Sequence, residues 1–194
     1  NGFEGCTALE SLSIESDSLE NLEGMQNMKA LNSINVFAKK LKNVDGLAGC
    51  ENLEHFRIDG ESLENLNGLK GCNKWKELDI PSSPSSLNID VLADMDGLRR
   101  INFEGCNLTS FELTREIPRI MGVKIISCNE LKSLEGVENF INLTKIVIKD
   151  CTKLENLKGL DGTKTLESVI IQDCKSLKDV DALLSLPKLE ILKM

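Results

Sequence analysis

The stretch of sequence that decides the fold is LTKIVIKDCTKLENLKGL, residues 143–160. Apolar and polar side chains alternate around Ile146 and Ile148, which is the two-residue period of a short β-strand with one buried face. Further apolar residues then follow at every third position: Leu154, Leu157 and Leu160. This period fits a 3₁₀ or extended turn better than an α-helix, whose apolar face needs spacings of three and four. The stretch therefore predicts a strand, a turn and a thin segment that is not α-helical.

The same unit recurs along the whole chain. Its first buried position, here called the anchor, returns after every 22 or 23 residues: Leu9, Leu31, Leu53, Trp75, Leu98, Ile120, Leu143, Leu166 and Leu189. Apolar side chains follow each anchor at offsets +3 and +5. A unit this short cannot bury its apolar side alone, so neighbouring units must stack around a continuous core.

The fold expected from these repeats is an α/β solenoid, mostly β with 3₁₀ or irregular segments. Each of the nine anchors should open one strand, and the parallel strands should form one curved sheet. We expect the solenoid to be right-handed, because crossovers between parallel strands almost always are.

The repeat pattern L-x-x-L-x-L-x-x-C-x-x-L-x-x-L-x-x-L, read at residues 143–160 and 166–183, resembles the leucine-rich repeat. Its 22-residue period and its rows of triplets are similar to the internalin type. The segments GCENL (49–53), GCNKW (71–75) and IPSS (80–83) also resemble the bacterial surface-antigen (BspA-like) repeats. The resemblance implies a leucine-rich-repeat solenoid that presents its strands on a concave face.

The ends of the chain carry expectations about its context. Residues 1–194 are expected to form a single leucine-rich-repeat domain of eight full repeats, with a partial repeat at each end, as part of a longer chain. The first partial repeat is residues 1–6, and the last strand ends with Leu192 and Met194 pointing inward. An uncovered end would expose a stacking face and an open strand edge. We therefore expect a neighbouring domain or a second copy of the chain to cover at least one end.

Two repeats depart from the pattern. In the fourth, Trp75 replaces the anchor leucine, and PSSPSS at residues 81–86 delays the next apolar residue. Its two prolines should push this loop off the strand edge, where it either forms a rim beside the concave face or is a tolerated surface insertion. In the fifth, residues 113–117 are expected to form one helical turn, which Pro118 helps to end.

Charge and hydropathy exclude several classes of partner. The chain has a net charge of −8, with 8 basic and 17 acidic residues in its first half and 15 basic and 14 acidic residues in its second. Binding to phosphate groups needs a positive potential, so nucleic acid and anionic membranes are not expected as the main partner. No apolar run reaches the ~18 residues of a membrane helix, which argues against membrane insertion.

The cysteines occupy two kinds of position. A structural ladder is expected from those that lie eight residues after an anchor: Cys106, Cys128, Cys151 and Cys174. The remaining three, Cys6, Cys50 and Cys72, each lie three residues before an anchor, in a slot that is otherwise apolar. Four rungs of a ladder extend over ~14 Å, too far for the ~2.3 Å ligand distances of a zinc site. Disulfides between rungs are compatible with the permitted Cα distances, but side chains that point in the same direction favour seven free thiols.

No catalytic constellation or cofactor site stands out in the sequence. His55 is the only histidine, there is no tyrosine, and no nucleophile is placed by sequence to be the partner of His55. We therefore expect no enzymatic activity and no cofactor or metal.

The outward slots of the strands, at offsets +2, +4 and +6, supply the candidate binding residues. The predicted ligand-binding residues on this face are Phe37, His55, Arg57, Asp79, Arg100, Asn102, Lys124, Ile126, Val147 and Ile170. Charges of both signs crowd the middle strands, and an apolar column is expected at Ile126, Val147, Ile170 and Ile191. The alternative without a binding function is that the charges keep a solvent-exposed face soluble and that the β-branched residues reflect strand propensity.

These observations favour a non-enzymatic recognition module that binds a protein ligand through its concave face. The family resemblance implies a bacterial cell-surface or secreted, adhesin-like protein. The alternative is a cytoplasmic scaffold or regulatory subunit that docks on an enzyme, and reduced buried cysteines fit such a compartment. A glycan ligand is disfavoured because tyrosine is absent and the lone Trp75 occupies a core anchor.

Overall fold

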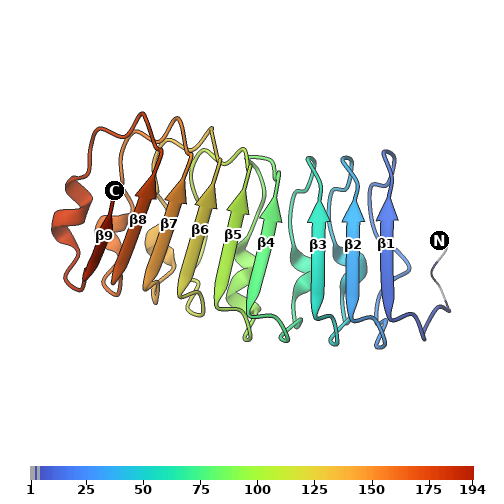
Figure 1. The fold of residues 1–194 in the computed structure, drawn as a ribbon. Helices are drawn as coiled ribbons and strands as arrows, with labels where there is room; N and C mark the ends of the chain where they lie inside the picture. The colour runs from blue at the N-terminus through green and yellow to red at the C-terminus, as the bar shows by residue number, and fades with distance from the viewer. Residues whose placement is uncertain (1–2, 4) are drawn as a thin grey trace.

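The computed structural model of the chain describes Phe3 and residues 5–194, so most of the expected N-terminal partial repeat lies outside the described residues. Within them, nine short strands stand side by side along an elongated solenoid (Figure 1). They are β1 (Ser11–Glu15), β2 (Ser33–Phe37), β3 (His55–Asp59), β4 (Glu77–Pro81), β5 (Arg100–Glu104), β6 (Gly122–Ile126), β7 (Lys145–Lys149), β8 (Ser168–Gln172) and β9 (Ile191–Lys193).

Every strand lies where the offset pattern places it. The residues at +3 and +5 are the inward positions; in β7 these are Ile146 and Ile148, both fully buried. Paired strands are parallel and align equivalent residues, so that Ile146 pairs with Val169 of β8. Seen from the strand side, each strand runs upward, the chain returns behind it, and successive repeats advance to the left (Figure 1). The solenoid is therefore right-handed, as expected.

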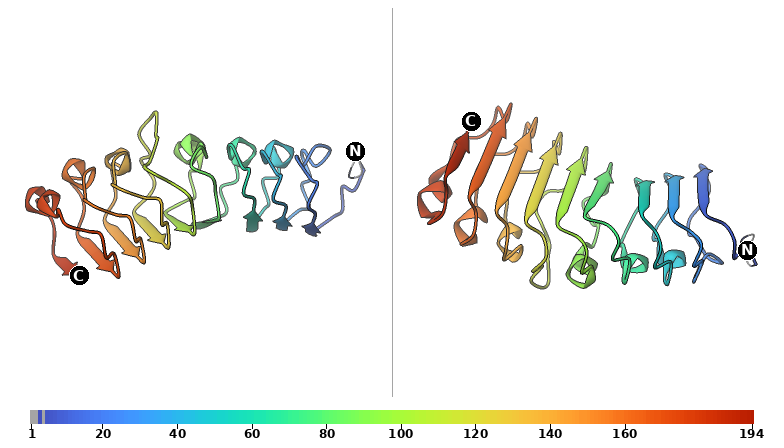
Figure 2. Two further views of the ribbon diagram at one scale, coloured as in Figure 1. Left: turned by 90° about the horizontal axis from the view of Figure 1, so that it is seen from above. Right: turned by 60° about the horizontal axis from the view of Figure 1, so that its bottom comes forward.

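The wall opposite the strands is built from short 3₁₀ segments. The described residues contain η1 (Asp45–Leu47), η2 (Asn67–Leu69), η3 (Asp90–Asp94), η4 (Val137–Asn139), η5 (Leu160–Gly162) and η6 (Asp181–Ser185). Figure 2 shows these turns in a row behind the strands, and the row of strands bends in its second half. The triplet spacing thus predicted the convex wall correctly. None of the helical segments in the described part of the chain is long and apolar enough to cross a membrane.

The helical turn expected at residues 113–117 is wrong, because the backbone there is not helical. The segment is instead tied to the repeats on both sides. The backbone N–H of Thr114 donates to Asp90 Oδ1 at 3.0 Å, and the Arg115 guanidinium donates to the Asp90 carbonyl at 2.9 and 3.1 Å. On the other side, the N–H of Ile117 donates to the Asn139 carbonyl at 2.7 Å. These contacts to neighbouring repeats replace the local hydrogen bonds of a helix.

Among the described residues, one hydrophobic core runs through the stacked repeats, from Leu22 to Leu186. The anchors from Leu31 to Leu166 are buried, including Trp75, which is only 4% exposed. Burying one such side chain contributes about 1.5–3 kcal/mol. Packing at the 3₁₀ wall is tight: a Cβ on Gly68 would lie 1.8 Å from the Val44 carbonyl oxygen. The shared core makes each repeat depend on its neighbours.

The strands form two sheets rather than the one that was expected. β1–β3 make a three-stranded sheet and β4–β9 a six-stranded sheet (Figure 1). Where strands pair, the amide just after one anchor donates to the equivalent carbonyl of the preceding repeat, as from Arg99 to Lys76 at 3.0 Å. At the junction of β3 and β4, the equivalent carbonyl, that of Glu54, accepts no backbone bond from any described residue.

Trp75 and Pro81 account for this break. The Trp75 indole is bulkier than leucine, stacks on Phe56 with ring centroids 5.0 Å apart, and donates its Nε1–H to the Leu53 carbonyl. Pro81 adds a second cause, because it has no N–H. The Ser82 amide points to β5, where it bonds Glu104, and amides alternate in direction along a strand. The missing N–H of Pro81 therefore falls on the side that faces β3.

The turn that follows each strand also changes at the break. In the first three repeats the residue at offset +7 is Ser16, Ala38 or Gly60, and none of these has a positive φ. In the next five repeats the residue at +7 is left-handed, with φ between 49° and 64°: Ser82, Gly105, Ser127, Asp150 and Asp173. The left-handed residue turns the chain so that the side chain at +8 points into the solenoid, which creates the ladder position.

The loop at residues 81–86 does not protrude as a whole, which corrects the expected rim. Pro81 is the last residue of β4 and pairs with Glu104. Ser83 is only 1% exposed, and its carbonyl accepts the Asn107 amide at 2.9 Å. Because Ser83 stands at offset +8, it takes the ladder position of its repeat. Only Ser85 and Ser86 are exposed within this loop.

Candidate functional site

The structure places all ten predicted binding residues on the strand face. Six are exposed and four are half-buried; the exposed ones are Phe37, His55, Arg57, Asp79, Arg100 and Lys124. The half-buried ones are Asn102, Ile126, Val147 and Ile170. Phe37 is 40% exposed, a high value for a large aromatic side chain. All ten side chains are thus on the concave surface, but they do not form one cluster.

Half of them meet in a hollow of about 300 Å³ at the break between the two sheets. The hollow is lined by Phe56, Arg57, Asp79, Pro81, Asn102, Phe103, Glu104, Lys124 and Ile126. Phe56 occupies an inward slot, and yet it is half-buried, whereas its neighbours in that slot, Ile34 and Leu78, are buried. The break therefore opens a path from the concave face to an aromatic side chain of the core. The sequence analysis missed Phe56 because its offset is that of a core residue. The bulky Trp75 at the next anchor was the feature of the sequence that could have indicated an opening here.

A hydrogen-bonded network joins four polar side chains of β4 and β5. Arg100 donates through Nε to Glu77 Oε2 at 2.9 Å, and Asn102 Nδ2 donates to Glu77 Oε1 at 2.8 Å and to Asp79 Oδ1 at 2.6 Å. The hydrogen bonds from Asn102 and Arg100 hold the pKa of Glu77 below its usual value. Glu77 was not among the predicted residues, although it lies directly opposite Arg100 in the register. Arg100 is thus partly engaged within the protein.

Arg57 and Phe37 form a second local arrangement beside the hollow. The Arg57 guanidinium carbon lies 5.7 Å from the centre of the Phe37 ring, within the range of a cation–π contact. Arg57 is exposed, and no carboxylate of the described residues lies within 4.0 Å of its side chain. An exposed aromatic ring beside an arginine without an acidic partner is the composition favoured in interface anchors.

The expected apolar column is not a single column, which corrects its geometry. Val147 and Ile170 are register partners on β7 and β8. Ile126 aligns instead with Lys149, and Ile191 aligns with Ser168. The apolar residues therefore follow a diagonal across the strands, because they occupy different offsets in successive repeats.

The cysteine ladder lies inside the solenoid, where the chain leaves each of the strands β5–β8, and not on the concave face. Cys106, Cys128 and Cys151 are buried and Cys174, near the end of the chain, is half-buried. Each thiol donates to a carbonyl, as Cys106 does to Ile80 at 3.0 Å and Cys151 does to Lys149 at 3.4 Å. The hydrogen bond to Cys106 and burial raise the pKa of Cys128. These contacts fit the expected structural role, and all seven cysteines have free thiols in the structure.

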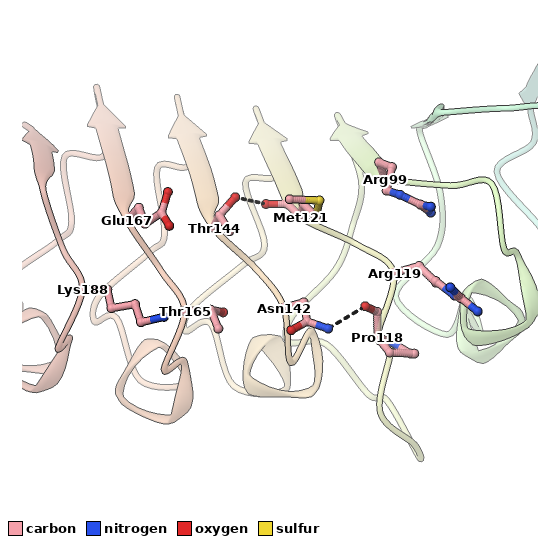
Figure 3. Close-up of a pocket in the computed structure, with 9 residues that line it drawn as sticks. All are labelled: Arg99, Pro118, Arg119, Met121, Asn142, Thr144, Thr165, Glu167 and Lys188. Atoms are coloured by element: carbon pink, nitrogen blue, oxygen red, sulfur yellow. Dashed lines mark hydrogen bonds between the residues drawn. The ribbon is translucent and has the colours of Figure 1, made fainter.

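A larger groove of about 370 Å³ lies along the edge where the strands of the second sheet begin (Figure 3). It is lined by Arg99, Pro118, Arg119, Met121, Asn142, Thr144, Thr165, Glu167 and Lys188. Its polar side chains bind the backbone of the preceding repeat: Asn142 Nδ2 donates to the Pro118 carbonyl at 2.9 Å and Thr144 Oγ1 to the Met121 carbonyl at 3.1 Å. Arg119 is paired with Asp96 at 2.8 Å. Because these groups already stack the repeats, the hollow at the break is the better candidate site.

Fold and concave face together define a solenoid of leucine-rich repeats. The chain belongs to the BspA type leucine rich repeat family, whose model matches residues 1–105 in six copies. A second model, that of the leucine-rich-repeat domain of the endo-beta-N-acetylglucosaminidase EndoS, matches residues 113–194. No curated protein matches the chain. The predicted leucine-rich-repeat family and solenoid are confirmed.

The chain is similar to several solved structures at low sequence identity, and the first of these shows the same fold. The leucine-rich repeat domain of the type III effector XCV3220 (XopL) is 18% identical, with a TM-score of 0.68 over 96% of this chain and 69% of that one. The TLR13–ssRNA13 complex is 13% identical, with a TM-score of 0.50 over 90% of this chain and 36% of that one. An internalin (inlF) from Listeria monocytogenes str. 4b F2365 is 12% identical, with a TM-score of 0.40 over 94% and 86%.

Proposed function

We propose that this chain is a non-enzymatic recognition module that binds a protein ligand through its concave face. The observation that carries the proposal is the hollow at the sheet break, where Phe56 and Phe103 form an apolar floor and Arg57, Asp79 and Lys124 supply charges at the mouth. Interface hot spots combine buried aromatic contact area with directional polar groups in this way. The leucine-rich-repeat families are interaction modules, which supports the same function.

We also propose that the module acts at a bacterial cell surface or after secretion, as an adhesin-like protein. The support is the membership of the BspA type family and the internalin resemblance of its repeats. The competing proposal, a cytoplasmic scaffold or regulatory subunit, draws support from the buried free thiols. Labelling of intact and permeabilised cells with an antibody separates them: labelling of intact cells supports the surface, and labelling only after permeabilisation supports the cytoplasm.

The binding proposal is tested by capture on the immobilised protein from host and bacterial extracts, followed by titration of the captured protein. Arg57→Ala should reduce both capture and affinity, and so should Asp79→Ala. Lys158→Ala, on the exposed turn after β7 and away from the strand face, is the matched control and should leave binding unchanged. Equal capture by all four proteins would overturn the proposed site.

Trp75 provides a second and independent readout. It is the only tryptophan of the chain, and it stacks on Phe56 at the floor of the hollow. A side chain that enters the hollow should therefore change the emission maximum or intensity of Trp75. Binding without any change in this signal would place the ligand elsewhere on the solenoid.

A further inference from the structure

The strand faces of the two ends of the solenoid carry opposite charge. The strands β1–β5 contain five carboxylates, Glu15, Asp59, Glu77, Asp79 and Glu104, against two arginines, Arg57 and Arg100. The strands β6–β9, drawn from yellow to red in Figure 1, contain no carboxylate and four lysines: Lys124, Lys145, Lys149 and Lys193. The lysines lie at the outward offsets, so all four amines are on the concave side.

These four lysines have no ion-pair partner in the part of the chain that the structure describes. Among the described residues, no carboxylate lies within 4.0 Å of any of their Nζ atoms, whereas Lys153, on the next turn, pairs with Glu130 at 2.7 Å. Most other ion pairs of the solenoid likewise join neighbouring repeats, as Lys42 joins Glu20 at 2.7 Å. The concave face of β6–β9 is therefore a patch of positive charge that no ion pair among the described residues neutralises.

Apolar side chains run through the same patch. On β7 the outward residues read Lys145, Val147 and Lys149, so that a half-buried valine lies between two lysines at ~7 Å spacing. Val147 aligns with Ile170 of β8, and Ile126 of β6 is the diagonal neighbour of Val147. We name these residues, with Lys124, Lys145 and Lys149, the lysine–aliphatic patch.

Negative charge borders the patch at its two rims and on the side of β5, where Glu104 aligns with Ile126. Asp150 and Asp173 lie in the turns just beyond β7 and β8, and Glu167 lies just before β8. A ligand that bears carboxylates is therefore repelled at the rims and attracted to the centre, where Val147 and Ile170 lie. The width of four strands is ~14 Å, which matches about four residues of extended chain.

We propose that the lysine–aliphatic patch binds an acidic segment of a partner protein that also carries aliphatic side chains. The carboxylates pair with Lys124, Lys145 and Lys149, and the aliphatic groups cover Val147 and Ile170. A pure polyanion would leave those apolar side chains uncovered. The inference rests on the proposed function, because it takes the concave face as the binding surface and names the chemistry of its partner.

Charge complementarity also favours β6–β9 over the rest of the concave face as the binding surface of an acidic segment. The first half of the chain carries 17 acidic and 8 basic residues, and its strand face repels an acidic ligand. An acidic segment is therefore steered to β6–β9, and the lysines there increase its association rate at low salt. Remaining contacts of the partner can still reach the hollow, because Lys124 and Ile126 line both sites.

The test uses fluorescein-labelled peptides of about twelve residues, titrated with the full chain and followed by fluorescence polarisation. One peptide combines Glu with Val and Leu; a second replaces Glu by Lys; a third keeps Glu and replaces the aliphatic residues by Ser. We expect saturable binding of the first peptide only, weakened by salt between about 50 and 500 mM. The double variant Lys145→Glu/Lys149→Glu should lower affinity at least about tenfold, and Lys158→Glu should not.

Several results would overturn the inference. These are absence of saturable binding of the Glu–aliphatic peptide, equal binding of the Ser peptide, and tighter binding of single-stranded RNA or of anionic lipid vesicles. A dimer in sedimentation that Lys145→Glu/Lys149→Glu dissociates would show that a second copy is the occupant. Circular dichroism of the double variant checks its fold, and Val147→Ser provides a second variant, which should weaken the Glu–aliphatic peptide several-fold.

A separate variant, Arg57→Ala, distinguishes failure of the proposed function from failure of the further inference. Arg57→Ala alters the hollow but not the lysine–aliphatic patch, so it should weaken capture of a natural partner and leave peptide affinity within about twofold. If Arg57→Ala weakens the partner but no acidic peptide binds, the proposed function stands and the further inference fails. If no concave-face variant affects a captured partner, the proposed function fails.

Discussion

The first three repeats and the five that follow build the same kind of strand but end it differently. In β1–β3 the chain leaves the strand through small residues such as Ala38 and Gly60, without a left-handed residue. After each of β4–β8, a left-handed residue at +7 turns the next side chain into the core, where the cysteine ladder forms. The two sheets meet at this change of turn. The comparison shows that repeats can share a core while their hydrogen-bonded sheets stay separate.

Two phenylalanines on either side of the break should differ in how much they contribute to the free energy of unfolding. Phe103, fully buried and in edge contact with Phe111 at 5.3 Å, belongs to the second sheet. Phe103→Ala should lower the free energy of unfolding by about 3–5 kcal/mol, because removal of a fully buried ring leaves a cavity in the core. Phe56→Ala, at the half-buried position beside the break, should cost about half as much. Urea denaturation measures both, and equal losses would show that the break does not loosen the packing.

A smaller effect is expected from the thiol of Cys72, in the repeat next to the break. Burial raises the pKa of Cys72 to about 11. The folded state therefore keeps a proton that the unfolded chain releases near pH 9, so stability should fall as pH rises from about 9 to 11. The loss should be about 1–2 kcal/mol, and Cys72→Ala should show a shallower slope than the parent chain. Identical slopes would contradict the assignment.

The thiols of the two regions should also differ in how fast they react with a maleimide. Cys6 is exposed and Cys174 is half-buried, whereas Cys128 and Cys151 are buried. A maleimide should label Cys6 first and Cys174 more slowly, and the buried ladder only after denaturation. Seven labels on the denatured chain without reductant are expected. A mass increase of about 2 Da on reduction would reveal one disulfide bridge, against the prediction of free thiols.

Substitutions of Arg57 and Arg100 test whether the concave face binds the partner. Arg57→Ala should weaken binding of a captured partner by about 1–2 kcal/mol, a typical loss for an interface anchor. Arg100→Ala should have a smaller effect, because its guanidinium already pairs with Glu77 at 2.8 Å. Isothermal titration measures both; a larger loss for Arg100→Ala would show that the partner displaces Glu77.

The smallest effect concerns stability at the network of β4 and β5. Glu77 and Arg100 are both exposed, so Glu77→Gln should change the free energy of unfolding by less than about 1 kcal/mol. Thermal unfolding provides the measurement. A loss of several kcal/mol would mean that the network, and not the core, holds β4 against β5.

How far the sequence predicted the molecule depends on the level of structure. The strands and the convex 3₁₀ wall were predicted because each repeat carries its own two- and three-residue periods, as around Ile146 and Leu154. The break and the hollow were not, because they depend on the size of one side chain, Trp75, against its neighbour Phe56. The pairing of Arg100 with Glu77 was also missed, since the offsets place both side chains on the outward face but do not show which of them pair.

Amide hydrogen exchange at single-residue resolution can detect the break between β3 and β4. In β5 the amide of Arg100 donates across to Lys76 at 2.9 Å, and the strand is paired in register with β4. The equivalent amides of β4, those of Glu77 and Asp79, face β3 without a ladder. They should exchange at least about tenfold faster than those of Arg100 and Asn102. Equal protection in β4 and β5 would show one continuous sheet without a break.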